Sequence, residues 1–65
     1  MNGYSYVYLL QSERDERRHY TGLTDNLSER LRKHNRGDVP HTAKYRPWKL
    51  RIAIAFAGRE AAAAF

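Results

Sequence analysis

Four side chains of this 65-residue sequence supply the groups that acid–base and anion chemistry require. Tyr8 and Tyr20 bring phenolic hydroxyls from two short aromatic segments, and a basic segment after them brings the guanidinium of Arg30 and the imidazole of His34. An arginine that borders the apolar stripe of a short helix needs an anionic partner, and its fork of donors fits a phosphate. The chain order predicts that these four groups reach one cleft, and none of them is needed to build so small a core.

Each of these side chains also has a structural interpretation that the sequence leaves open. Tyr8 belongs to a tyrosine stripe on one face of a strand, and such stripes commonly pack half-buried. Arg30 has Glu29 beside it as a carboxylate partner. His34 ends an apolar stripe near the C-terminus of its helix, where a packed histidine is favourable. On this interpretation the four groups stabilise a core and do no chemistry.

The basic residues are concentrated in one part of the chain. Residues 30–51 hold eight arginines and lysines and one acidic residue, whereas residues 1–29 hold three basic and five acidic residues. A basic block that includes aromatic residues suits a polyanion, because cations release counterions from phosphates and rings stack on bases. A solvated surface that keeps the protein soluble is the alternative. The residues that we predict to contact nucleic acid are Thr24, Arg32, Lys33, Arg36, Lys44, Arg46, Trp48 and Lys49.

Three segments read as strands. Aromatic and branched residues alternate over residues 4–10, and a second short strand is expected over 19–23, antiparallel to the first because the connection is too short for a crossover. The charged residues between them predict a solvated hairpin loop without a chemical role. A third strand is expected over 48–57, where strict alternation places four apolar side chains on one face: Leu50, Ile52, Ile54 and Phe56.

Helices are expected after the second and third strands. Asn26 with Glu29 three residues later has the capping-box spacing, so a helix is predicted over 27–36, ended by Gly37. Residues 38–47 read as an irregular basic loop. An alanine-rich helix begins at Arg59. These elements predict an α/β fold with a small three-stranded antiparallel sheet flanked by helices, in the order β-β-α-β-α, with a truncated last helix.

Length and composition limit the kind of protein. Sixty-five residues form one domain at most, with a core near the lower size limit for folding alone. The sequence has no cysteine, which excludes disulfides and thiolate metal sites. Its apolar runs are far shorter than the ~20 residues of a membrane span, and the N-terminus lacks the pattern of a secretory signal. We therefore expect a cytoplasmic protein that does not enter a membrane.

The ordered set of motifs resembles the GIY-YIG nuclease superfamily. Tyr6-Val7-Tyr8 stands at the first signature, Tyr20-Thr21-Gly22 at the second, and Arg30 and His34 follow on the helix. The segment 45–50, Tyr-Arg-Pro-Trp-Lys-Leu, is similar to the small stand-alone bacterial members, which resemble the N-terminal domain of an excision-repair nuclease. The resemblance covers essentially the whole chain, as a single domain of residues 1–65, and implies a role in DNA repair.

The resemblance implies a metal-dependent endonuclease domain that hydrolyses phosphodiester bonds in DNA, with Mg²⁺ or Mn²⁺ as the cofactor. In the family's mechanism Tyr8, assisted by His34, would act as the general base or orient the water. Arg30 would clamp the phosphate, and Tyr20 would hydrogen-bond a phosphate oxygen or the nucleophile. An ordinary phenol has a pKa of about 10, so Tyr8 would act as a base only if cationic neighbours such as Arg30 lower its pKa.

The sequence departs from the family pattern at several positions. Tyr6 stands where the first signature has glycine, Val7 where it has isoleucine, and Thr21 where the second signature has isoleucine. The family's metal-binding glutamate lies on the helix after the third strand, and Glu60 falls roughly two turns too early for that role. No metal ligand is therefore assigned, and we expect the C-terminal helical part of the domain to be missing. Nucleic-acid binding is expected to outlast catalysis.

Two other functions remain open from the sequence. A non-catalytic nucleic-acid binding module would use the basic residues and the aromatic residues Tyr45 and Trp48. A small protein-interaction domain would use an edge of the third strand. The sequence sets neither the oligomeric state nor the preferred form of nucleic acid.

Overall fold

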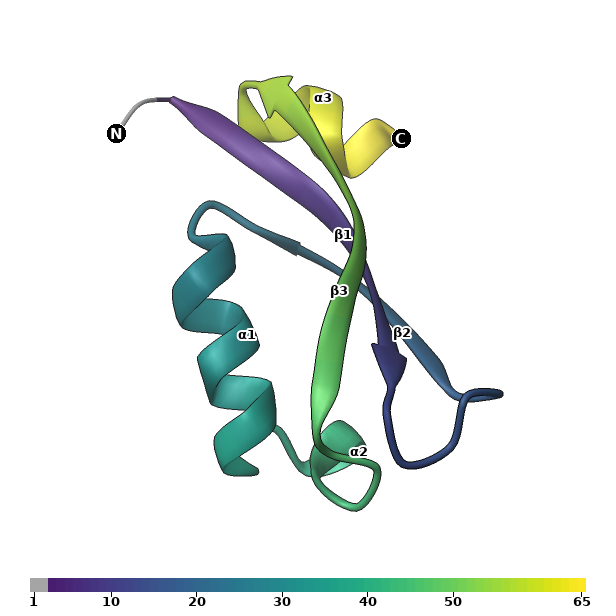
Figure 1. Cartoon of the computed structure of the whole chain (residues 1–65). Coiled ribbons are helices and arrows are strands. Elements are labelled where there is room, and N and C mark those ends of the chain that lie inside the picture. Colours follow the sequence, from purple (N-terminus) through teal and green to yellow (C-terminus); the bar gives the residue numbers. More distant parts are fainter. Residues whose placement is uncertain (1–2) are drawn as a thin grey trace.

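The computed structural model describes residues 3–65 and confirms the expected α/β architecture. The elements are β1 (Tyr4–Ser12), β2 (His19–Thr24), α1 (Leu27–Arg36), α2 (Pro40–Ala43), β3 (Trp48–Ala57) and α3 (Arg59–Ala64) (Figure 1). The strands form an antiparallel sheet in the order β2-β1-β3, so β1 is the central strand and pairs along both edges. Within residues 3–65 no helix is long and apolar enough to cross a membrane.

The central strand carries the core on the face that α1 covers. Tyr8 and Leu10 of β1 and Trp48 of β3 are buried, with exposed fractions of 3%, 0% and 4%. The partly buried side chains packed against them are Tyr20, Leu27, Leu31 and Tyr45. The cluster therefore combines a sheet face with the apolar stripe of α1, as the helical spacing of Leu27 and Leu31 predicts.

Helix α1 begins and ends where the local signals predict. The side chain of Asn26 accepts a hydrogen bond from the backbone N–H of Glu29 at 3.2 Å, which caps the helix. At the other end Gly37 adopts a left-handed conformation with φ 85°, and its N–H donates to the carbonyl of His34. Both ends are fixed by residues adjacent in sequence, so the position of His34 on α1 is well defined.

A β-bulge changes the expected faces of β3. Leu9 pairs with Ile52 but Leu10 pairs with Leu50, which leaves Arg51 as an extra residue. Because paired residues share a face and neighbours alternate, Leu50 and Ile52 lie on opposite faces of the sheet. The predicted strict alternation of 48–57, with Leu50 and the isoleucines on one side, is therefore wrong at this point.

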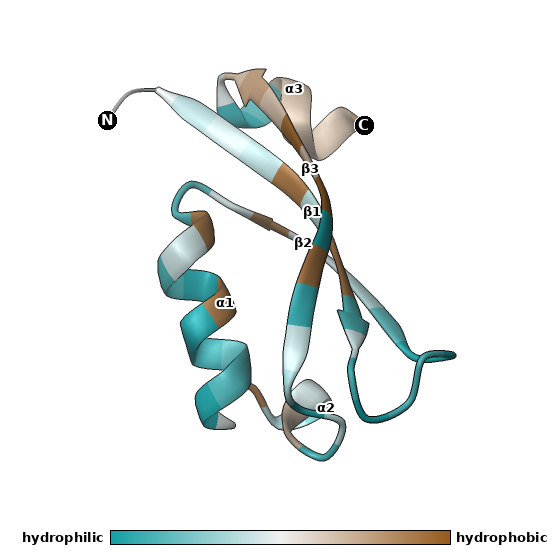
Figure 2. Ribbon diagram, in the orientation of Figure 1, coloured by the Kyte–Doolittle hydropathy of each residue, from teal (hydrophilic) through white to brown (hydrophobic). Residues whose placement is uncertain are grey.

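The second face of the sheet is only partly covered. Ile52 and Ile54 remain 52% and 37% exposed, and β3 is among the most hydrophobic parts of the ribbon in Figure 2. Helix α3 contacts β1 and β3 and buries Ala62. The ring of Phe65 lies 5.2 Å from that of Phe56. The short terminal helix thus covers one end of this apolar face.

The segment expected to be an irregular loop contains the short helix α2. Pro40 occupies the first turn, where its fixed backbone angle and missing N–H are tolerated. The hydroxyl of Thr42 donates to the carbonyl of Val39 at 3.2 Å, and the indole N–H of Trp48 donates to the carbonyl of Thr42 at 2.8 Å. The prediction of irregular structure over 38–47 is therefore wrong for residues 40–43. This helical turn has no side-chain cap that the sequence could reveal, and contacts with the core hold it in place.

Candidate active site

Tyr8 lies in the middle of the central strand with its ring buried against α1. Its backbone partner on β2 is Gly22. A Cβ atom added at Gly22 would overlap the phenolic oxygen and ring of Tyr8. Gly22 does not have a positive φ, so its backbone conformation does not require glycine. A glycine is needed here because the phenol of Tyr8 crosses directly over the backbone of Gly22.

The imidazole of His34 links Tyr8 to α2. The hydroxyl of Tyr8 lies 3.1 Å from Nε2 of His34, and Nδ1 lies 2.8 Å from Oγ1 of Thr42. All three side chains are buried, with exposed fractions of 3%, 0% and 2%. They form a chain of hydrogen bonds from the centre of the sheet to the short helix.

The hydrogen bonds of Thr42 determine the direction of this chain. Its hydroxyl has one proton, which it donates to the carbonyl of Val39. Oγ1 must then accept the hydrogen bond from Nδ1–H of His34, and in a neutral imidazole this leaves Nε2 as the acceptor. Nε2 therefore accepts a hydrogen bond from the phenolic hydroxyl of Tyr8. In this position the imidazole can take the phenolic proton during a reaction.

The local electrostatics keep both partners neutral at rest. Burial lowers the pKa of His34, and the positive charge of Arg30 lowers it further. Burial also raises the pKa of Tyr8, as does the neighbouring Tyr20, while Arg30 lowers it by less. The expected lowering of the Tyr8 pKa by cationic neighbours is therefore outweighed, and the phenol acts in its protonated form, as a donor to His34.

Tyr20 completes the aromatic part of the site. Its ring centroid lies 4.9 Å from that of His34 and 6.4 Å from that of Tyr8. Its side chain is half-buried, and within residues 3–65 its hydroxyl makes no hydrogen bond. The structure thus brings Tyr8, Tyr20 and His34 together and leaves one phenolic hydroxyl available to a ligand.

Arg30 lies on α1 one turn before His34 and is half-buried. It lines a hollow of about 170 Å³ at the start of the helix, together with Thr24, Asp25, Asn26, Glu29 and Lys33. In the described part of the chain Arg30 forms no ion pair, so the carboxylate of Glu29 does not neutralise it. A half-buried guanidinium without a carboxylate partner favours an anionic ligand.

The other predicted nucleic-acid contacts fall into different environments. Arg32, Lys44, Arg46 and Lys49 are exposed and Lys33 is half-buried. Arg36 is exposed but forms an ion pair with Asp38 at 2.8 Å. The hydroxyl of Thr24 is buried and bonds the backbone of Asn26, which shapes the turn into α1.

Trp48 lies in the core instead of on the surface. Its ring is 4% exposed and its indole N–H is bonded to Thr42. The side chain of Asn35 bonds both the backbone N–H and the carbonyl of Trp48. The ring is thus unavailable for stacking on a base, in contrast to what the basic and aromatic pattern suggests.

Thr42 and Asn35 are the site residues that sequence reasoning missed. Thr42 orients His34 from eight positions away, and Asn35 fixes the start of β3 from 13 positions away. No local spacing signals these contacts, since both depend on how the segment around α2 folds back onto α1. The sequence hints at the role of Thr42 by placing this polar residue two positions after Pro40, which can begin a helical turn.

The described residues do not form a site for a divalent cation. Within residues 3–65 there is no group of three or more histidine, cysteine or carboxylate side chains that could hold a metal ion. Both ring nitrogens of His34 are engaged by Tyr8 and Thr42. Glu60 lies alone and exposed in the first turn of α3. The donor set therefore does not fit a metal ion, and no chemical step is assigned to one.

Replacing Thr42 with valine tests the direction of the hydrogen-bond chain. The change keeps the shape of the side chain but removes the acceptor for Nδ1–H of His34, which is expected to cost about 1–3 kcal/mol of unfolding free energy. Nuclear magnetic resonance of the imidazole nitrogens would report the tautomer, which should no longer be confined to Nδ1–H. Thr42→Ser is the control and should keep it. An unchanged tautomer in Thr42→Val would contradict this assignment.

Comparison with models of protein families gives a match over nearly the whole chain. Residues 4–65 match the model described as the GIY-YIG catalytic domain. Neither the curated proteins nor the solved structures yield a match.

Proposed function

The chain belongs to the GIY-YIG family, whose members are nucleases that act on nucleic acid, and on this premise we propose that it hydrolyses phosphodiester bonds in DNA. The observation that carries the proposal is the buried chain from Tyr8 through His34 to Thr42, near the guanidinium of Arg30, which forms no ion pair within residues 3–65. The site thus combines a group that accepts a proton, the imidazole of His34, with a group that binds phosphate, the guanidinium of Arg30. These are two of the requirements for hydrolysis of a phosphodiester.

The proposed reaction begins with the substrate phosphate bound to Arg30. Its bidentate donors contact the non-bridging oxygens, where negative charge grows in the transition state. The hydroxyl of Tyr20 donates a further hydrogen bond to the phosphate. Because no carboxylate of residues 3–65 forms an ion pair with Arg30, its charge is available for this role.

Proton transfer runs through the buried chain. Water attacks phosphorus and gives its proton to the oxygen of Tyr8 as the phenolic proton moves to Nε2 of His34. The imidazolium is then stabilised by the bond from Nδ1–H to Thr42. The phosphorus–oxygen bond to the leaving group breaks, and the leaving oxygen takes a proton from solvent. Tyr8 thus relays a proton without having to be ionised beforehand, which suits its raised pKa.

Nucleases of this family typically depend on a divalent cation, and our proposal names Mg²⁺ or Mn²⁺ as that ion. The described residues supply no set of ligands for such an ion. A metal ion supplies much of the charge stabilisation in phosphodiester hydrolysis. We therefore propose that cleavage by this chain is slow but measurable, while DNA binding is retained.

A non-catalytic nucleic-acid binding module is the second candidate. It is favoured by the missing cluster of metal ligands within residues 3–65 and by the exposed side chains of Arg32, Lys44, Arg46 and Lys49. In that case the buried site would serve only to stabilise the domain.

Replacing Arg30 with alanine separates the two candidates. Loss of a positioned group that stabilises charge in the transition state is expected to lower the cleavage rate by roughly 10²–10³-fold. The measurement is cleavage of labelled DNA with Mg²⁺ or Mn²⁺, alongside binding. Arg32→Ala is the matched control, because it removes one exposed charge from the same helix.

The outcomes distinguish an enzyme from a binding module. A much larger loss of cleavage in Arg30→Ala than in Arg32→Ala, with similar DNA binding in both variants, supports the proposed nuclease. Equal effects of the two substitutions on cleavage would contradict the assigned role of Arg30. DNA binding without cleavage by the unaltered chain, with either metal ion, would support the binding module.

A further inference from the structure

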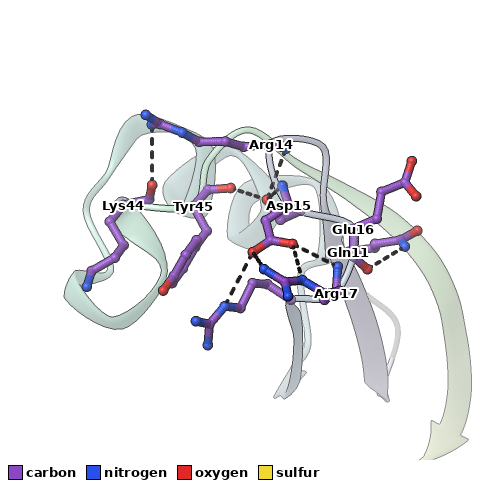
Figure 3. A network of polar contacts seen from close by, with 9 residues as sticks. Gln11, Arg14, Asp15, Glu16, Arg17, Lys44 and Tyr45 are labelled. Atoms are coloured by element: carbon purple, nitrogen blue, oxygen red, sulfur yellow. Dashed lines mark hydrogen bonds and ion pairs between the residues drawn. The ribbon is translucent and has the colours of Figure 1, made fainter.

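A large open hollow lies away from Tyr8 and Arg30, between the β1–β2 loop and the segment that joins α2 to β3. Its volume is about 1110 Å³. The residues that line it are Arg14, Asp15, Arg17, Asn35, Ala43, Lys44, Tyr45, Arg46 and Pro47. Figure 3 shows the β1–β2 loop and the Lys44–Tyr45 segment facing each other across this region. The loop charges, which had no predicted role, thus share one surface with the basic segment.

Hydrogen bonds hold the two loops together. The hydroxyl of Ser12 donates to the carbonyl of Tyr45, and the N–H of Glu13 donates to the carbonyl of Pro47 at 2.9 Å. Ser12 also accepts hydrogen bonds from the N–H groups of Arg14 and Asp15, which shape the loop. Contacts that join residues 33 positions apart give this hollow fixed walls.

The charges around the hollow are unbalanced. Four cationic side chains line it, and Asp15 is the only carboxylate among the lining residues. That carboxylate pairs with Arg17 at 3.2 Å and with Arg18 at 3.7 Å, and Arg17 in turn holds the pKa of Asp15 below its usual value. In the described part of the chain Arg14, Lys44 and Arg46 form no ion pair. Mutually repelling cations held around one hollow favour a ligand with several negative charges.

The hollow adjoins the site of Tyr8 and His34. Asn35 follows His34 on α1, and Ala43 follows Thr42 on α2, so the two sites are neighbours along both helices. Arg30 and Asn35 are separated by about 8 Å along the axis of α1. At ~3.4 Å per base step, this corresponds to roughly two base steps of a duplex. A nucleic-acid strand that runs along α1 with one phosphate at Arg30 would therefore reach the hollow within a few nucleotides.

We propose that this hollow binds the phosphodiester backbone of the nucleic-acid substrate a few nucleotides from the scissile phosphate, with Arg14 and Arg17 of the β1–β2 loop as contacts. The inference rests on the proposed function and extends it to a second contact surface. Arg14 is the main contact, because Arg17 is shared with Asp15. Among residues 3–65 its side chain makes a single, long hydrogen bond, 3.4 Å, to the carbonyl of Lys44, so it can turn to a phosphate at little cost.

The test compares Arg14→Gln and Arg14→Gln/Arg17→Gln with Arg59→Gln. Arg59 is exposed at the start of α3, at the opposite end of the molecule from α2 and the β1–β2 loop (Figure 1), so it is a matched control for one lost charge. Binding of a fluorescent duplex of roughly 16 base pairs would be measured across a range of salt concentrations. A labelled dinucleotide, which is too short to reach the hollow, is the second probe. Thermal unfolding would verify that each variant remains folded.

Loss of one phosphate contact is expected to reduce the magnitude of the slope of log K against log salt by about 0.9, where K is the association constant. This corresponds to roughly eightfold weaker binding at 0.1 M salt. Arg14→Gln should show this with the duplex but leave dinucleotide binding unchanged, and Arg59→Gln should change neither. A duplex affinity of Arg14→Gln equal to that of Arg59→Gln would overturn the proposal. Equal weakening with both probes would also overturn it, since the hollow would then bind phosphate regardless of strand length.

The binding experiment also separates this inference from the proposed function. If Arg30→Ala leaves cleavage unchanged but Arg14→Gln weakens duplex binding, the nuclease mechanism fails and the backbone contact stands. If Arg30→Ala impairs cleavage and Arg14→Gln behaves like Arg59→Gln, the mechanism stands and the hollow has no part in binding.

Discussion

Gly22→Ala is expected to destabilise the domain by about 1–3 kcal/mol and to remove any nuclease activity. The added methyl group would overlap the phenol of Tyr8, which has no free space to move because its ring is buried and its hydroxyl is bonded to His34. The other flanking strand has Ala53 opposite Tyr8, so a methyl group is tolerated on that side only. Chemical denaturation and a cleavage assay would measure the two effects.

A double-mutant cycle identifies the cause of this effect. If overlap with the phenol is responsible, Gly22→Ala should be much less destabilising when Tyr8 is also replaced by alanine, because the two residues are in contact. The backbone at Gly22 does not require a positive φ, so strain of the chain does not confound the comparison. Additive effects of Gly22→Ala and Tyr8→Ala would contradict the explanation.

His34 is expected to make the stability of the domain depend on pH in the mildly acidic range. In the unfolded chain an imidazole has a pKa of about 6.5, whereas burial lowers the pKa of His34 in the folded protein. Above the unfolded value both states are neutral and stability is unaffected. As the pH falls below about 6.5 only the unfolded state binds the proton, so stability declines by at most ~1.4 kcal/mol per pH unit until the lower folded pKa is reached.

Unfolding free energies between neutral and mildly acidic pH would test this prediction. His34→Gln removes the titrating group and should reduce the slope, although its overall stability will be lower because Tyr8 and Thr42 lose their shared partner. His19→Gln is the control, since His19 is exposed. A slope in His34→Gln equal to that of the unaltered chain would show that another group is responsible. Activity should fall only at still lower pH, near the lowered pKa of His34 in the folded protein, because a protonated imidazole cannot accept the phenolic proton.

Local patterns in the sequence specify the elements and the order in which they carry the reactive groups. Helix α1 is delimited by Asn26 and Gly37, which act on their immediate neighbours, and the strands are indicated by alternation over a few residues. The antiparallel sheet follows because the connection between the first two strands is short. These short-range patterns, together with the family resemblance, therefore predict that the four reactive groups lie in one region of the molecule.

How these groups act depends on contacts between segments that are distant in the sequence. The proton direction depends on the contact of Thr42 with His34, the burial of Trp48 depends on Asn35, and the hollow depends on the bond from Ser12 to Tyr45. Each contact joins separate elements, so no local pattern encodes it. Likewise the raised pKa of Tyr8 results from burial under α1, which overcomes the charge of Arg30. Protonation and binding surfaces thus follow from packing, because desolvation and long-range hydrogen bonds exist only once the chain has folded.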